Sequence, residues 1–128
     1  MRQIPREDDS AYKGTIELAG VHFRRMDKTM VQMAGPQFMK QAREPFAMEV
    51  ETANPLPKTP RNTSAILIVN GEKILDTWMV LPNKLIAFFP DSRKIRESNS
   101  VAAAWTGAEA TSQTRKPLTF RRQDVKIE

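Results

Sequence analysis

Few residues of this chain have the types and spacing that catalysis requires. The sequence has one histidine, His22, and no cysteine, so the usual clusters of metal ligands and a cysteine nucleophile are absent from it. It also lacks a glycine-rich phosphate loop and a G-x-S-x-G nucleophile elbow. The carboxylate pairs are Asp8 with Asp9, near the start, and Glu49 with Glu51, on the polar face of an expected strand. Because solvation is the ordinary role of such pairs, we expect no catalytic, cofactor-binding or metal-binding residue and no enzymatic activity.

Positive charge is the more informative chemical feature. The chain has 20 Lys and Arg against 15 Asp and Glu, a formal net charge of +5. This balance favours acidic partners, such as nucleic acid or an acidic protein surface. Binding of single-stranded nucleic acid also needs aromatic platforms, and Tyr12 is the evident candidate for an exposed one. Alternatively, basic residues on edge strands prevent unwanted strand pairing. The basic residues form four groups: Arg24, Arg25 and Lys28; Arg93, Lys94 and Arg96; Arg115 and Lys116; and Arg121 and Arg122.

A methionine-rich segment at residues 24–44 is a second candidate for contact with a partner. Gly35-Pro36 divides it: the first half fits a strand or a short helix, and residues 36–43 fit a helix with proline in its first turn. Methionine fills irregular gaps in cores and also suits adaptable binding surfaces, so both roles stay open here. As an interaction surface we single out seven residues: Tyr12, Arg24, Arg25, Met30, Met33, Arg121 and Arg122.

The elements that must position these residues are organised around residues 65–89. Two turn signals, Asn70-Gly71 and Pro82-Asn83, separate three runs of β-forming residues. Asn-Gly adopts positive φ at both central positions of a type I′ turn, which makes it a strong hairpin signal. We therefore expect a three-stranded meander. Residues 65–69 and 85–89 should be its covered strands, because they are apolar on both faces.

The other expected strands turn alternate residues inward. Residues 14–23, 45–52, 100–105 and 118–120 fit such strands, and Gly20 indicates a bulge or bend in the first. The prolines of residues 54–62 favour an extended connection between two sheets. About seven short strands predict an all-β fold, an immunoglobulin-like antiparallel β-sandwich, with a short helix in the 36–43 region. The expected aromatic core consists of Trp78, Phe89, Trp105 and Phe120.

The length of 128 residues fits one domain with short extensions. We expect a flexible N-terminal arm at residues 1–13, the sandwich at residues 14–122 and a C-terminal tail at residues 123–128. No apolar stretch approaches the ~20 residues that cross a bilayer, and no apolar stretch follows the charged N-terminal residues as in a signal peptide. These features predict cytoplasmic synthesis without a signal peptide and no membrane association.

Five motifs follow one another in the order of a known family. Residues 20–23 (Gly-Val-His-Phe) match a G-x-x-F strand end, residues 69–71 (Val-Asn-Gly) match a V-x-G hairpin, and residues 85–90 match a strand that ends in proline. Residues 100–105 and 117–120 match the last two strands. In this order the chain resembles the IPT/TIG family of immunoglobulin-like domains over about residues 14–121. It departs from the family pattern in its long interval between residues 23 and 65, and in lacking the proline-rich opening.

The resemblance implies an interaction, spacer or dimerisation module without a family catalytic site. Together with the composition, it predicts a non-enzymatic structural module that docks into a larger assembly through a protein partner or self-assembly. Because viral particles carry immunoglobulin-like domains, analogy predicts a virion component, such as a head-decoration or tail-associated protein. Two alternatives stay open: a Rel-like nucleic-acid-associated module, and a carbohydrate-binding surface module that uses an exposed Trp78 or Trp105.

Overall fold

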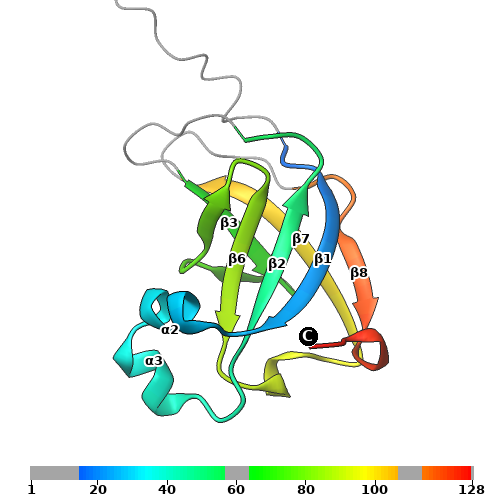
Figure 1. Ribbon diagram of the computed structural model, residues 1–128. Helices are drawn as coiled ribbons and strands as arrows, with labels where there is room; N and C mark the ends of the chain where they lie inside the picture. Colours follow the sequence, from blue (N-terminus) through cyan, green and yellow to red (C-terminus); the bar gives the residue numbers. More distant parts are fainter. Residues whose placement is uncertain (1–14, 57–63, 107–113, 128) are drawn as a thin grey trace, which may run out of the picture.

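The computed structural model describes residues 15–56, 64–106 and 114–127, and these form two antiparallel sheets that pack face to face (Figure 1). Two short helices, α2 (Lys28–Ala34) and α3 (Pro36–Gln41), connect β1 to β2. Single turns of 3₁₀-helix, η1 (Ser92–Lys94) and η2 (Arg122–Asp124), follow β6 and β8. The eight described strands are β1 (Leu18–Arg25), β2 (Phe46–Thr52), β3 (Ser64–Val69), β4 (Glu72–Ile74), β5 (Trp78–Leu81), β6 (Lys84–Phe89), β7 (Ser98–Thr106) and β8 (Leu118–Arg121).

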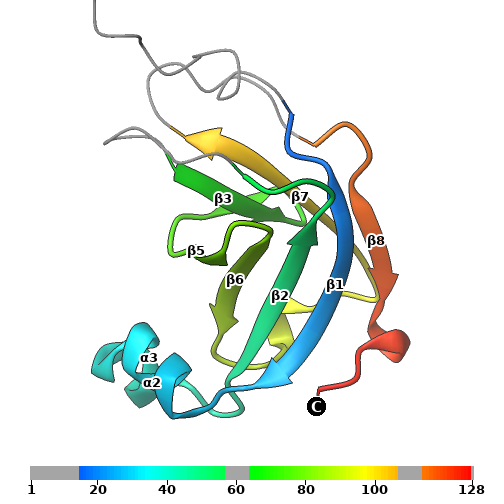
Figure 2. The ribbon, with the colours of Figure 1, turned by 45° about the horizontal axis from the view of Figure 1, so that its top comes forward.

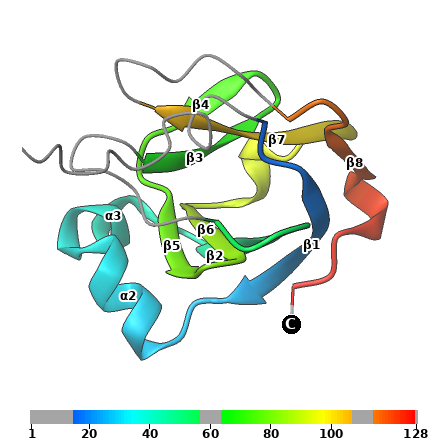
Figure 3. The same ribbon diagram turned by 90° about the horizontal axis from the view of Figure 1, so that it is seen from above.

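The strand order is that of an immunoglobulin fold. The first sheet has the order β1-β2-β6-β5 and the second the order β4-β3-β7-β8, seen as two layers in Figure 3. With the strands lettered along the chain, these orders read A-B-E-D and C′-C-F-G, the arrangement of immunoglobulin sheets. The prediction of an immunoglobulin-like sandwich is therefore confirmed, with eight described strands where about seven were expected.

Residues 65–89 do not form the predicted three-stranded meander. The first turn is as predicted, because Asn70 has φ 52° and Gly71 has φ 82°, and it joins β3 to β4. The next run breaks after Ile74, where the Thr77 hydroxyl donates to the Ile74 carbonyl (2.6 Å) and accepts from the Leu67 N–H (3.0 Å). The chain then crosses to the other sheet as β5. Residues 65–69 and 85–89 are flanked by neighbours on both sides as expected, but β3 and β6 belong to different sheets.

The hydrophobic core fills the space between the sheets. Its largest fully buried side chains come from β2, β3, β6 and β7, and each such burial contributes roughly 1.5–3 kcal/mol. The Phe23 ring lies against Phe46 and Phe120, with centroids 6.0 and 5.2 Å apart. Of the expected aromatic core, Phe89 and Trp105 are buried, and Phe120 is partly buried and packs against the core cluster. Trp78 was wrongly assigned to it, since it is 43% exposed.

A helical layer covers part of the outer face of the first sheet. Met30 of α2 packs on Ala47 and Ile86, and Phe38 of α3 lies 6.3 Å from Phe88 between ring centroids. The Asp27 side chain accepts from the Met30 N–H (2.8 Å) and caps α2, the half of the segment whose structure the sequence left open. The predicted helix at residues 36–43 is α3, with Pro36 in its first turn. By covering Ala47, this layer contributes to the burial of β2, which was expected to be half-buried but is buried on both faces from Phe46 to Val50.

The first strand begins later and ends later than predicted. It spans Leu18–Arg25 rather than residues 14–23, and its register against β2 shifts between Leu18 and Gly20, as the bulge prediction required. The C-terminal segment returns to this strand, where Ile127 forms a parallel bridge with Phe23 and Val125 packs against the core. The predicted arm at residues 1–13 and most of the proline-rich connection lie outside the described residues.

Candidate functional site at an open sheet edge

The predicted arginine surface is divided between two places. Arg24 and Arg25 are exposed at the end of β1, and Arg121 and Arg122 are exposed where β8 continues into η2. Arg24 lines a hollow of about 540 Å³ beside β1, whereas Arg121 and Arg122 line a separate one with Glu97. The structure therefore does not gather the four arginines into one hollow.

The apolar members of the predicted surface do not join them. Met30 is 6% exposed and is a core residue of the helical layer, which answers the question that the sequence left open for this methionine. Met33 is partly buried on the same helix, and Tyr12 lies outside the described residues.

The hollow beside β1 mixes charges of both signs. Arg24 Nη1 donates to Glu49 Oε1 at 3.0 Å, and Glu49 is only 7% exposed. His22, Asp124 and Lys126 line the same hollow. Across the described ranges, no group of three or more His, Cys, Asp and Glu side chains is arranged to hold a metal ion. Because positive and negative side chains are mixed here, the hollow is suited neither to a cation nor to an anion.

Three of the four basic groups contain an arginine that pairs with a carboxylate of the same chain: Arg24 with Glu49, Arg93 with Asp91 (2.9 Å) and Arg115 with Glu17 (3.6 Å). The Arg93 guanidinium donates hydrogen bonds to Asp91 and lowers the pKa of that carboxyl, while Asp91 raises the pKa of Arg93. These positive charges are partly compensated, which weakens the case for phosphate binding. The nucleic-acid alternative stays a prediction, to be tested by the steep salt dependence that phosphate contacts impose.

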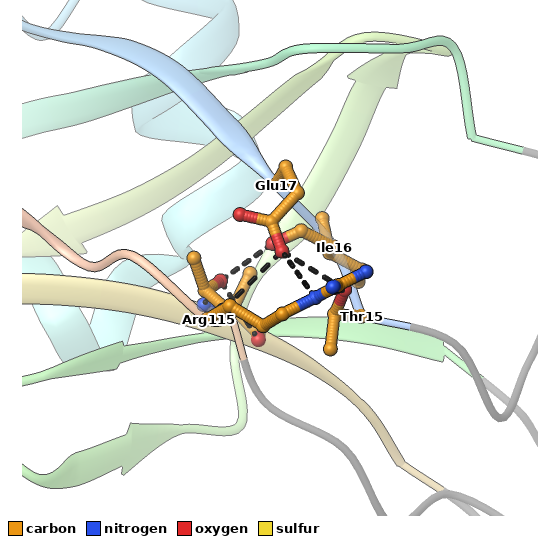
Figure 4. Close-up of polar contacts among 6 residues, drawn as sticks. Thr15, Ile16, Glu17 and Arg115 are labelled. Atoms are coloured by element: carbon orange, nitrogen blue, oxygen red, sulfur yellow. Dashed lines mark hydrogen bonds and ion pairs between the residues drawn. The ribbon is translucent and has the colours of Figure 1, made fainter.

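Glu17 lies at the junction of residues 15–17 with residues 114–115 (Figure 4). The Thr15 hydroxyl donates to Glu17 Oε1 at 2.9 Å, and this bond is the main reason why the pKa of Glu17 lies below its ordinary value. The Arg115 N–H donates to the same oxygen at 3.3 Å. The carboxylate therefore ties two distant parts of the chain together.

The most distinctive surface is one that the sequence did not predict. Large apolar side chains are exposed along residues 75–81, which we call the open edge. Of six exposed large apolar residues in the described chain, five lie here: Leu75 (76% exposed), Trp78 (43%), Met79 (45%), Val80 (38%) and Leu81 (52%). A concentration of this kind is typical of a surface that contacts another molecule.

The open edge also offers unpaired backbone groups. Within the described residues, β5 pairs with β6 on one side and with no strand on the other. Figure 2 shows β5 beside β6, away from β1 and β8. An edge strand presents N–H and C=O groups to solvent, and proteins usually protect such edges with charged residues. β5 has no charged residue, although its short length and the register shift between Met79 and Leu81 limit pairing.

On the outer face of the first sheet, residues form rows that run from the open edge at β5 across to β1. The strand register places Trp78, Ile86, Glu49 and His22 in one row across the four strands. The next row contains Leu81, Lys84, Glu51 and Gly20. Trp78 thus lies on the outer face, next to Ile86 of β6, on which Met30 of the helical layer packs. This position keeps the indole out of the core.

One sequence signal could have identified this edge. Residues 78–81 are apolar without alternation and Pro82 follows directly, and proline at a strand is typical of an edge. The sequence instead predicted that Trp78 belongs to the aromatic core. Comparisons with protein-family models, curated proteins and solved structures gave no match. No described helix has the length and apolar character needed to span a bilayer.

Proposed function

We propose that this chain is a non-enzymatic structural or interaction module that docks into a larger assembly through the open edge. The observation that carries the proposal is the concentration of five exposed large apolar side chains at residues 75–81, beside an unpaired strand. Apolar burial and completion of backbone hydrogen bonds both favour a partner at such a place. A virus particle is one assembly of this kind, proposed by analogy with immunoglobulin-like domains in virions.

The test is whether the open edge is needed for incorporation into the assembly. A charged residue in the middle of the edge, Val80→Lys, should prevent docking and leave the fold intact, because Val80 is exposed. Thr119→Lys is the matched control, since Thr119 is exposed on β8, an edge of the other sheet. The three forms are compared by size fractionation and native mass spectrometry of extracts from the source.

The wild type and Thr119→Lys should migrate in a large complex, and Val80→Lys should migrate as the free chain. A wild-type chain found only as a free monomer would exclude the proposal. Val80→Lys that still enters the complex would exclude the open edge as its docking site. Circular dichroism of Val80→Lys checks that the β-sandwich is retained.

A second candidate is carbohydrate binding, favoured by the exposure of Trp78 on the outer face of the first sheet. An exposed indole gives an apolar platform for a sugar ring, and His22, Glu51 and Lys84 on the same face supply polar groups. Trp105 is 4% exposed, so sugar-induced changes in the emission of accessible tryptophan would report on Trp78. Saccharide binding should be lost in Trp78→Ala and kept in Val80→Lys, whereas protein docking should be lost in Val80→Lys.

A further inference from the structure

We propose that the occupant of the open edge is a second copy of this chain, whose β5 pairs antiparallel with the first about a two-fold axis close to Met79 and Val80. The proposal rests on the function proposed above, because it names the partner of the same edge. The axis stands perpendicular to the first sheet. The joined sheet runs from β1 of one copy, through the two β5 strands, to β1 of the other.

The backbone supplies the first argument. β5 is hydrogen-bonded to β6 alone among the described residues, so the groups on its other side are available to a strand. Antiparallel pairing satisfies donors and acceptors of both strands at once. A two-fold axis also buries the same apolar residues from both copies, and closed two-fold dimers are the commonest soluble oligomers.

The distribution of charge distinguishes a second copy from an acidic partner. Residues 74–83 contain one charged residue, Asp76, and no lysine or arginine, in a chain with 20 Lys and Arg. A site for an acidic partner would carry basic residues, because opposite potentials face each other across interfaces. Two chains of net charge +5 repel each other least where neither presents basic residues. The open edge therefore suits a copy of the same basic chain.

The charges at the two ends of the edge are complementary in this orientation. Asp76 precedes β5, and Lys84, which pairs with Leu81, begins the neighbouring strand β6. Antiparallel pairing turns the acidic start of one copy toward the basic end of the other. A parallel arrangement would instead place Asp76 near Asp76 and Lys84 near Lys84.

The helical layer gives a fourth argument. Helix α2 covers one end of the outer face of the first sheet, at Ala47 and Ile86. It does not cover the other end of this face, where Gly20, Glu51 and Lys84 form a row. A two-fold axis between the two β5 strands reverses the strand direction from one copy to the other. The helical end of one copy therefore lies beside the uncovered end of the other, and the two helical layers do not collide.

The size of the contact predicts its strength. A strand of four residues makes a small interface, below the ~1,200 Å² of standard stable complexes. The dimer should therefore be weak and concentration-dependent. Sedimentation velocity of the purified full chain over a wide concentration range should show a monomer–dimer equilibrium. Val80→Lys should weaken it by about tenfold or more, because like charges then meet across the axis, while Thr119→Lys should leave it within about twofold.

A cross-link tests the geometry separately. The chain has no cysteine, so Val80→Cys introduces a single thiol. With the axis near this residue, the two Cα atoms fall within the ~4.4–6.8 Å that a disulfide spans. Mild oxidation should give a covalent dimer from Val80→Cys and much less from Thr119→Cys at equal concentration. Equal yields from the two variants would overturn the pairing.

The two proposals fail in different ways. If the wild type is monomeric at every concentration while Val80→Lys loses its place in the native complex, the partner is another molecule. Self-pairing is then wrong and the proposed function stands. If the wild type dimerises and Val80→Lys dimerises equally well, the self-pairing proposal is also wrong. Concentration-dependent dimers, lost in Val80→Lys and captured by Val80→Cys, support it.

Discussion

On one lateral side of the sandwich, β1 of one sheet contacts β8 of the other, whereas on the other side β5 has no further neighbour among the described residues. The joined side contains Phe23 and Phe120, with ring centroids 5.2 Å apart, and the bridge between Phe23 and Ile127. Figure 3 shows β5 on the side opposite β1 and β8. The two edge strands of the first sheet thus differ: β1 is covered by other parts of the chain, and β5 is left open.

Two threonines show the difference in detail. On the joined side, the Thr114 hydroxyl accepts from the Ala103 N–H (2.8 Å) and donates to the Ile16 carbonyl (2.6 Å), linking the approach to β1 to a central strand of the other sheet. On the open side, Thr77 makes the equivalent pair of bonds, but both partners, Leu67 and Ile74, belong to the second sheet. The first threonine connects the layers, whereas the second only ends a strand before the chain crosses. We infer that the joined side contributes to the stability of the fold and that the open side is available for contact with a partner.

The largest predicted effect is on stability, and it compares a large-to-small substitution on the joined side with one on the open edge. Phe23→Ala should lower the free energy of unfolding by about 3–5 kcal/mol, because the ring is 8% exposed and packs on two other phenylalanines. Met79→Ala on the open edge should change it by less than about 0.5 kcal/mol. Urea denaturation at low protein concentration measures both, and Phe23→Leu is the milder variant if Phe23→Ala does not fold. Similar losses at the two positions would mean that β5 is as structural as β1.

The difference between the two sides was only partly predictable from the sequence. Alternation and the Asn70-Gly71 turn predict strands and a hairpin, because these depend on local periodicity and on the φ that glycine and asparagine tolerate. The sheet to which a strand belongs depends on where the chain crosses, and that crossing is marked here by one threonine, Thr77, without proline or glycine. Exposure of Trp78 depends on β5 being last in its sheet, which is a property of the whole topology. Local residue patterns therefore placed Trp78, which lies on an edge strand, in the core.

The second prediction compares the two threonines. Thr114→Val should cost about 1–3 kcal/mol, because Thr114 is 6% exposed and the buried Ala103 N–H and Ile16 carbonyl lose their partner. Thr77→Val should cost about half as much, since Thr77 is only partly buried and water can replace the hydroxyl. Thr114→Ser keeps the hydroxyl and is the control. If Thr114→Ser were as costly as Thr114→Val, packing of the methyl group rather than hydrogen bonding would be responsible.

The third prediction concerns the ion pair on β1. Arg24→Ala should destabilise by about 1–2 kcal/mol, because it leaves the nearly buried Glu49 carboxylate without the arginine at 3.0 Å. The cost stays below that of a fully buried pair, since half of the Arg24 side chain is exposed. Arg25→Ala is the matched control and should stay within about 0.5 kcal/mol, since Arg25 is exposed and forms no ion pair with a described residue. Glu49→Gln added to Arg24→Ala should recover part of the loss; no recovery would show that the arginine acts through packing.

The smallest predicted effect tests the junction at Glu17, where residues 15–17 meet residues 114–115. Its pKa in the folded chain lies below the ordinary value of 4.5, so its contribution to stability is fully present above that pH and is lost as the pH falls through the folded pKa. Thr15→Val removes the hydroxyl hydrogen bond, which is the largest cause of the lowered pKa of Glu17. Arg115→Ala removes only the guanidinium and keeps the backbone N–H that donates to Glu17. Thr15→Val should therefore return the pKa of Glu17 further toward 4.5 than Arg115→Ala does, as followed by NMR titration of the carboxyl carbon. Added salt should weaken only the guanidinium part, because exposed charges are screened and the hydroxyl hydrogen bond is not. The reverse order of the two variants would assign the junction to charge instead of hydrogen bonding, and the joined side of the sandwich would then loosen with salt as well as with acid.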